Sequence, residues 1–316
     1  MESKEVIFTE KGRKRLDELL GDQPDVHSRS YAKKLIKNGQ VKVNEFIVTK
    51  SGLLLKDGDI IIYKHILEDK IRVSGEPIPL DIIFEDDDVL VLSKPAGIVV
   101  HPGAGNITGT LAAGVVNYLG GASKGLDPTR PGIVHRLDKD TSGVLIVAKN
   151  LTSQSYLGDL FKSRRIKKMY KVLVYGKVKE REGTIKTLIG RHKVDRQKMA
   201  VTDAESRGRT AITHFSVDSY YELKEDPTRL FTLLNVDLKT GRTHQIRVHM
   251  KKLGHPVVGD SLYTGRKMIR EYPVADRQLL HSYSLELILP GGREKKFVSP
   301  LPKDFLDYLS RLHKIG

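Results

Sequence analysis

The residues best suited to chemistry are two carboxylates, Asp138 and Asp140, in the loop 135–143 (HRLDKDTSG). Apolar runs at 132–134 and 144–148 flank this loop and are typical of buried strands. Enzymes commonly hold reactive groups on polar loops that a rigid frame positions in this way. The same residue types also form ordinary turns, so the loop alone leaves a catalytic and a structural role open.

A second polar segment, 240–250 (TGRTHQIRVHM), offers a cation for such a carboxylate. Its histidines, His244 and His249, are five residues apart, a spacing that suits neither one face of a helix nor one face of a strand. We therefore expect no metal site here. If the segment is a strand, Gln245, Arg247 and His249 share a face, and Arg247 could pair with a carboxylate from elsewhere. Such a partner keeps a carboxylate ionised and oriented at neutral pH.

The third segment, 164–172 (RRIKKMYKV), places Tyr170 in a basic run. A tyrosine among cations suits base stacking beside phosphate contacts, although it could equally pack at the start of a strand. Residues 161–200 contain 14 lysines and arginines but three acidic residues, a net +11 of the chain's +15. This excess favours a polyanionic partner, because neutralised phosphates release counterions. The strand-like spacing of valine and isoleucine argues against a basic helix on a membrane surface.

Composition excludes several other classes of protein. With 39% hydrophobic and 29% charged residues, the 316-residue chain suits a soluble globular protein. No apolar run reaches the ~20 residues that cross a bilayer, and the N-terminus lacks the pattern of a secretion signal. The chain has no cysteine, which excludes disulfides and thiolate sites. We expect a cytoplasmic protein that does not bind membranes.

Two domains are expected to position these residues. Residues 1–66 predict a small α/β domain with helical patterns at 12–20 and 30–37 and strands at 41–44 and 59–63. Ser28 or Ser30 is the expected N-cap of the second helix. Residues 67–80 are expected to form a linker.

Residues 81–316 predict an α+β domain, a largely antiparallel mixed sheet flanked by helices. The clearest helical patterns lie at about 110–119 and 152–163. The expected strands lie at 133–134, 144–148, 170–174, 230–238 and 284–289.

Together the motifs resemble those of a known family, the RluA-type pseudouridine synthases. The matching segments follow the family's order over roughly residues 80–300: Lys94–Gly97, His135–Gly143, Lys168–Tyr170, Thr240–His249, Gly254–Asp260 and Leu279–His281. The first 66 residues resemble an S-four-type RNA-binding domain, named after a small-subunit ribosomal protein. This domain and the run 101–106 (HPGAGN) make the chain similar to the RluD-like branch, which acts on large-subunit ribosomal RNA.

The resemblance implies a pseudouridine synthase fold and the isomerisation of specific uridines. The implied essential group is Asp138, which either attacks the ribose or removes a proton from it. By motif position its cationic partner is Arg247 and not Arg242. The implied role of Tyr170 is to stack on the uracil and help remove its C5 proton. An isomerisation implies neither a cofactor nor a metal.

The resemblance also implies RNA contacts and a monomeric enzyme. Arg136 would hold the opened RNA, and either Leu279 or Leu280 would pack under the base. The two helices of the S-four-type domain would present Arg13, Lys14, Arg15, Lys33, Lys34 and Lys37 to RNA. The basic excess of 161–200, which lies beside Tyr170 in sequence, predicts further RNA contacts at Arg164, Arg165, Lys168, Arg191, Lys193, Arg196 and Lys198, and Arg242 is expected to contact RNA as well. Two alternatives stay open: a non-catalytic ribosome-assembly factor and a synthase acting on transfer RNA. A methyltransferase is disfavoured, because the chain lacks a convincing glycine-rich nucleotide loop.

Overall fold

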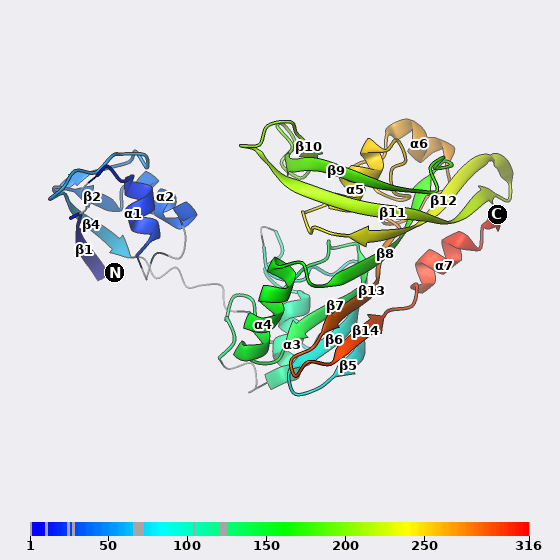
Figure 1. The fold of residues 1–316 in the computed structure, drawn as a ribbon, viewed down its shortest axis with the longest axis horizontal. Coiled ribbons are helices and arrows are strands. Elements are labelled where there is room, and N and C mark those ends of the chain that lie inside the picture. Colours follow the sequence, from blue (N-terminus) through cyan, green and yellow to red (C-terminus); the bar gives the residue numbers. More distant parts are fainter. Residues whose placement is uncertain are drawn as a thin grey trace. The chain divides into compact units, whose positions relative to one another are not determined.

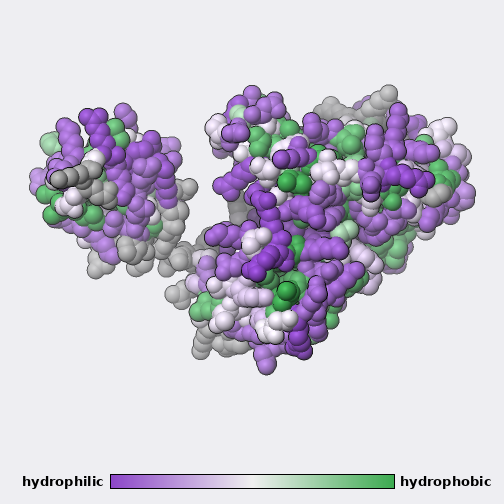
Figure 2. All heavy atoms as spheres, viewed as in Figure 1, coloured by the Kyte–Doolittle hydropathy of each residue, from purple (hydrophilic) through white to green (hydrophobic). Residues whose placement is uncertain are grey.

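The computed structural model describes residues 2–9, 12–23, 26, 29–65, 73–103, 105–120 and 125–315. The chain divides into two compact units, Met1–Lys70 and Ile71–Gly316 (Figure 1). Hydrophilic side chains dominate the surface in view on both units (Figure 2). No described helix is long and apolar enough to cross a membrane.

The first unit packs two helices against a small sheet whose strand order is β1-β4-β2-β3. Its elements are β1 (Glu2–Ile7), α1 (Leu16–Gly21), α2 (Arg29–Lys37), β2 (Val41–Val43), β3 (Phe46–Ile47) and β4 (Ile60–His65). Helix α1 begins later than the pattern indicated, because Arg15 is extended and acts as its N-cap. Ser30 lies inside α2 and so is not its N-cap, and Ser28 lies outside the described residues.

The second unit is built on a large mixed sheet, which confirms the expected α+β class. Its path runs β10-β9-β11-β12-β8-β13-β7-β6-β5, with β14 beside β13 and β15 beside β11. The strands are β5 (Ile82–Glu85), β6 (Val89–Lys94), β7 (Ser142–Ala148), β8 (Lys167–Tyr175), β9 (Glu182–Arg191), β10 (Met199–Val201), β11 (Gly208–Leu223), β12 (Asp226–Leu238), β13 (Leu280–Ile288), β14 (Glu294–Val298) and β15 (Leu312–Lys314). The helices are α3 (Leu111–Leu119), α4 (Leu151–Lys162), α5 (Gln245–Lys252), α6 (Arg266–Glu271) and α7 (Lys303–Leu309).

Helices α3 and α4 cover opposite faces of strands β6 and β7. Side chains alternate between the two faces of a strand, so Leu90 and Leu145 join the α3 core while Val89 and Ile146 join the α4 core. Both strands are therefore buried on both faces, as their continuous apolar runs indicate.

Strand β13 joins the two halves of this sheet. It pairs antiparallel with β8 and parallel with β7, where His281 lies opposite Ser142. The backbones approach so closely that a Cβ at Gly143 would lie 2.2 Å from the carbonyl oxygen of Ser282, and Gly143 also has φ 114°. Only glycine fits this position without strain. The loop that carries Asp138 therefore ends at the junction between the halves.

One expected strand, the conditional strand reading of 245–249 and part of the expected linker differ from the structure. Residues 245–252 form helix α5, so the condition that this segment is a strand is not met, and Gln245, Arg247 and His249 do not share a strand face. Ile133 makes only an isolated bridge to Val147, and no strand forms at 133–134. Residues 67–72 lie outside the described residues, whereas 73–80 belong to the second unit and pack on its core through Val73 and Leu80.

Candidate active site

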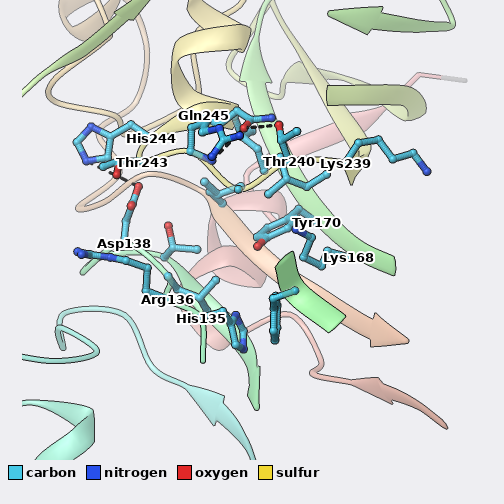
Figure 3. A pocket seen from close by; sticks show the side chains of 18 of the residues that line it. His135, Arg136, Asp138, Lys168, Tyr170, Lys239, Thr240, Thr243, His244 and Gln245 are labelled. Atoms are coloured by element: carbon cyan, nitrogen blue, oxygen red, sulfur yellow. Dashed lines mark hydrogen bonds and ion pairs between the residues drawn. The ribbon is translucent and has the colours of Figure 1, made fainter. Parts of the chain in front are cut away.

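A pocket of about 430 Å³ opens where the Asp138 loop, strand β8 and the start of α5 meet. Asp138 rises from the loop towards His244 on the opposite wall (Figure 3). Tyr170 and Lys168 extend from β8, and Leu280 from the start of β13. The structure thus brings together the aspartate, tyrosine and arginine motifs that lie far apart in sequence.

Asp138 is held by an arginine that is itself clamped by a second carboxylate. Arg247 Nη1 donates to Asp138 Oδ2 at 3.2 Å. The same guanidinium donates from Nε and Nη2 to the two oxygens of Asp260, at 2.7 and 2.9 Å. Asp260 is 1% exposed, and its Oδ1 also accepts backbone N–H groups of Leu262 and Tyr263. A bidentate, buried contact of this kind fixes the plane of the guanidinium.

Helix α5 places Arg247 because polar side chains anchor the helix to neighbouring strands. Gln245 Nε2 donates to the Thr213 hydroxyl and the Ile212 carbonyl, both at 3.0 Å. The ring nitrogens of His249 hydrogen-bond Thr213 and Thr187 at 2.7 and 2.9 Å. Burial lowers the pKa of His249 to about 4, so its ring stays neutral at neutral pH.

Tyr170 and Lys168 have environments that change their proton affinity. Burial raises the pKa of Tyr170 to about 12, against the effect of its hydrogen bond with Ser282, so the phenol keeps its proton at neutral pH. Burial lowers the pKa of Lys168 to about 8, although Asp237 opposes the shift. Lys168 is therefore a cation at neutral pH that loses its charge under mildly alkaline conditions.

His244 lies on the other side of Asp138. It is the N-cap of α5 in a left-handed conformation, with φ 55°. Its Nε2 is 3.9 Å from Asp138 Oδ2, and its Nδ1 hydrogen-bonds the Tyr263 hydroxyl at 2.9 Å. Burial lowers the pKa of His244, with Asp138 acting in the opposite direction.

The structure separates the expected RNA contacts into two groups. Some line the pocket with Asp138: Arg136, Arg164, Lys168, Arg242 and Leu280. The others lie outside the pocket lining: Arg165, Arg191, Lys193, Arg196, Lys198, Leu279, and, in the first unit, Arg13, Lys14, Arg15, Lys33, Lys34 and Lys37.

The individual contacts explain several of these placements. Of the two leucines, Leu280 reaches the pocket whereas Leu279 is buried in a different apolar cluster with Phe305. Arg165 Nε donates to the Ser163 hydroxyl. Arg242 Nε donates to the Thr210 carbonyl, so the two arginines of the 240–250 segment are bound differently.

Sequence reasoning missed the roles of three residues around Asp138: Asp260, His244 and Tyr263. Asp260 ends the segment 254–260 that was singled out for its resemblance, which was the available signal for its importance. His244 was considered only as a metal ligand. Tyr263 belongs to no motif that was recognised, and nothing in its spacing pointed to the site.

Comparison with known proteins identifies the family. Residues 88–252, which include Asp138, Tyr170 and Arg247, match the family described as RNA pseudouridylate synthase. The chain belongs to this family. Residues 14–61 match the S4 domain, an RNA-binding module. The expected family, enzyme class and N-terminal domain are therefore confirmed, and the chain is a pseudouridine synthase, an isomerase.

Full-length relatives and solved structures agree. The chain is 40% identical to "Ribosomal large subunit pseudouridine synthase D" of Pseudomonas aeruginosa, over 98% of this chain and 95% of the relative. It is also 40% identical to the "Uncharacterized RNA pseudouridine synthase YlyB" of Bacillus subtilis, over 97% of each chain. The solved "Human RNA Pseudouridylate Synthase Domain Containing 1" is 27% identical with a TM-score of 0.59, covering 77% of this chain and 91% of that one.

Proposed function

We propose that this synthase isomerises specific uridines of large-subunit ribosomal RNA, as a cytoplasmic monomer, with Asp138 as the group that acts on the target ribose. The observation that carries the catalytic assignment is the Asp138–Arg247 pair, 3.2 Å apart in a pocket that Tyr170 also lines. The printed name of the Pseudomonas relative supports the ribosomal target. One chain supplies all the proposed catalytic groups, in agreement with a monomer.

Each residue of the pocket has a separate role in the proposed isomerisation. The bond between uracil N1 and ribose C1′ breaks, the base turns, C5 bonds to C1′, C5 loses a proton and N1 gains one. Arg247 orients the Asp138 carboxylate towards the sugar, because Asp260 fixes its guanidinium. The Tyr170 ring stacks on the uracil, and its raised pKa keeps the phenol neutral in that position. Leu280 packs against the base from the junction of the sheet.

The target base must leave its stack to enter this pocket. Flipping costs a few kcal/mol for a paired base and less in a loop. Cations around the opening offset this cost by contacting the neighbouring phosphates: Arg136, Arg164, Lys168 and Arg242. The S4 domain adds contacts to RNA outside the target nucleotide.

Replacement of the carboxylate tests the catalytic assignment. Asp138→Asn should abolish pseudouridine formation in transcribed ribosomal RNA while RNA affinity stays within a few-fold, because the amide removes the reacting group and little surface. Asp140→Asn is the matched control, since the neighbouring Arg277 contacts its backbone carbonyl and not its side chain. Full activity of Asp138→Asn would overturn the assignment.

Mapping pseudouridines tests the target. Cells with and without the protein should differ at uridines of large-subunit ribosomal RNA, and transfer RNA should be unchanged. Loss of pseudouridines confined to transfer RNA would refute the proposed substrate but not the proposed chemistry.

A further inference from the structure

A buried hydroxyl links a basic hairpin to the catalytic pocket. Tyr263 is 4% exposed, and its hydroxyl accepts the backbone N–H of Met199 at 2.8 Å. The same oxygen is 2.9 Å from His244 Nδ1 and 3.2 Å from the Met199 carbonyl oxygen. The Tyr263 ring also contacts the Arg247 guanidinium, 5.1 Å from the ring centre. One side chain therefore touches the hairpin and both residues that face Asp138.

The hairpin formed by β9 and β10 carries part of the basic excess of the chain. Met199 is the first residue of β10 and lies directly opposite Arg191 in the antiparallel register. The connection 192–198 adds Lys193, Arg196 and Lys198. Arg191 Nη1 donates to the Arg196 carbonyl at 2.6 Å, which ties the strand to its connection. Tyr263 thus holds the hairpin at Met199, the residue opposite Arg191.

We propose that Tyr263 is a positioning residue that couples RNA contact at the β9–β10 hairpin to the orientation of His244 and Asp138. This inference rests on the proposed role of Asp138. RNA phosphates that bind Arg191 fix the hairpin, and the Met199–Tyr263–His244 hydrogen bonds transmit that position to the pocket.

The hydrogen-bonding capacity of the hydroxyl specifies what it transmits. A phenol has one proton to donate and accepts the Met199 N–H, so its proton goes to His244 Nδ1 or to the more distant Met199 carbonyl. When Nδ1 accepts, the proton of the neutral imidazole lies on Nε2, which faces Asp138 Oδ2 at 3.9 Å. A Tyr263 hydroxyl that donates to Nδ1 selects the ring form that presents an N–H to the carboxylate, whereas one that donates to the Met199 carbonyl leaves Nδ1 to donate to the phenol oxygen.

The backbone of His244 shows that this position needs external support. A left-handed conformation is unfavourable for a residue other than glycine and persists only when surrounding contacts impose it. The bond to Tyr263 is one such contact, and anchoring of α5 through Gln245 is another. Loss of the hydroxyl removes the contact that also reaches the hairpin.

Tyr263→Phe deletes the hydroxyl and keeps the ring beside Arg247. With enzyme in excess over RNA, the single-turnover rate should fall about ten-fold while RNA affinity stays within about two-fold, because small misplacements of reacting groups lower rate more than binding. Tyr308→Phe is the matched control, since it removes a buried hydroxyl that contacts the Pro273 carbonyl, outside the pocket lining. A wild-type rate for Tyr263→Phe would overturn the proposal.

A double-mutant cycle separates coupling from a local structural effect. Arg191→Gln should weaken RNA binding and also lower the single-turnover rate at saturating enzyme. In the Tyr263→Phe background, Arg191→Gln should weaken RNA binding by the same factor as in the wild type but should not lower the single-turnover rate further. Rate losses that multiply in the double variant would refute coupling.

A second variant keeps the test decisive if Tyr263→Phe folds poorly. His244→Gln should show the same rate loss and the same insensitivity to Arg191→Gln, and a wild-type response to Arg191→Gln would refute the proposal. Activity of Asp138→Asn would instead refute the proposed function, whatever Tyr263→Phe does, so the two failures are distinguishable.

Discussion

Replacing Asp260 by asparagine tests whether the clamp on Arg247 controls the active site. The amide keeps the size of the side chain and one oxygen for the N–H groups of Leu262 and Tyr263. It removes the negative charge and turns an NH₂ group towards the guanidinium. In the unmutated protein, Nε and Nη2 of that guanidinium donate to the two oxygens of the Asp260 carboxylate. Arg247 then keeps Asp138 as its remaining carboxylate partner.

The structure sets the expected size of the effect. Removing one member of a buried ion pair costs about 3–5 kcal/mol, and the surviving contact with Asp138 favours the lower end, about 3 kcal/mol. In a unit of this size, each kcal/mol of lost stability lowers the unfolding midpoint by about 2–4 °C, so the loss of about 3 kcal/mol lowers it by roughly 6–12 °C. A shift of Arg247 by about 1 Å would lower the rate on the order of 100-fold.

Calorimetry should detect the lower midpoint in the transition of the second unit. Release of tritium from RNA labelled at C5 of uridine, measured under single-turnover conditions at about 25 °C where the variant is folded, should detect the slower reaction. Asp226→Asn is the control, because Asp226 pairs with Arg229 with 41% of its side chain exposed and should cost under about 1 kcal/mol. If Asp260→Asn matches this control in both stability and rate, the clamp does not hold Arg247 in place.

Two further outcomes follow from the pocket. RNA affinity measured by fluorescence anisotropy should weaken as pH rises through about 8, because the lowered pKa of Lys168 makes it lose its proton there. Lys168→Arg should remove this pH dependence, since arginine stays charged. An identical pH dependence in both proteins would exclude Lys168 from RNA contact. Leu280→Ala should slow turnover about ten-fold and leave RNA affinity nearly unchanged. Leu279→Ala should instead lower the free energy of unfolding by about 2–5 kcal/mol, without a comparable rate loss in the folded enzyme. Equal rate losses at both positions would contradict the placement of Leu280 alone in the pocket.

Helix α5 shows where sequence patterns stop being informative. Residues 245–250 are all buried, and a helix buried on every side has no amphipathic period. Alternation of Gln245, Ile246, Arg247 and Val248 instead matched the period of a strand. The conditional strand reading therefore does not hold, whereas the expected pairing of Arg247 with a carboxylate is confirmed. By contrast, β6 and β7 were predictable, because strands buried on both faces form continuous apolar runs.

Contacts across the fold could not be derived from spacing. Asp138 and Arg247 are 109 residues apart, and their pairing was expected only through motif resemblance. The pairing of Asp260 with Arg247 could not be predicted from the sequence, because a lone aspartate after a glycine is also typical of a turn. Leu279 and Leu280 are equally apolar neighbours, and only the strand geometry of β13 directs one of them into the pocket.

Strand β13 has a consequence for synthesis of the protein on the ribosome. Along the described sheet path, β13 is the strand between β7, which follows the Asp138 loop, and β8. Its pairing with β7 joins His281 to Ser142, so the loop bearing Asp138 and the half bearing Arg247 meet only after residues 280–288 have emerged. Domains fold in order as the chain is made, so the S4 domain can form long before this closure. A growing chain could thus recognise RNA well before it could modify a uridine.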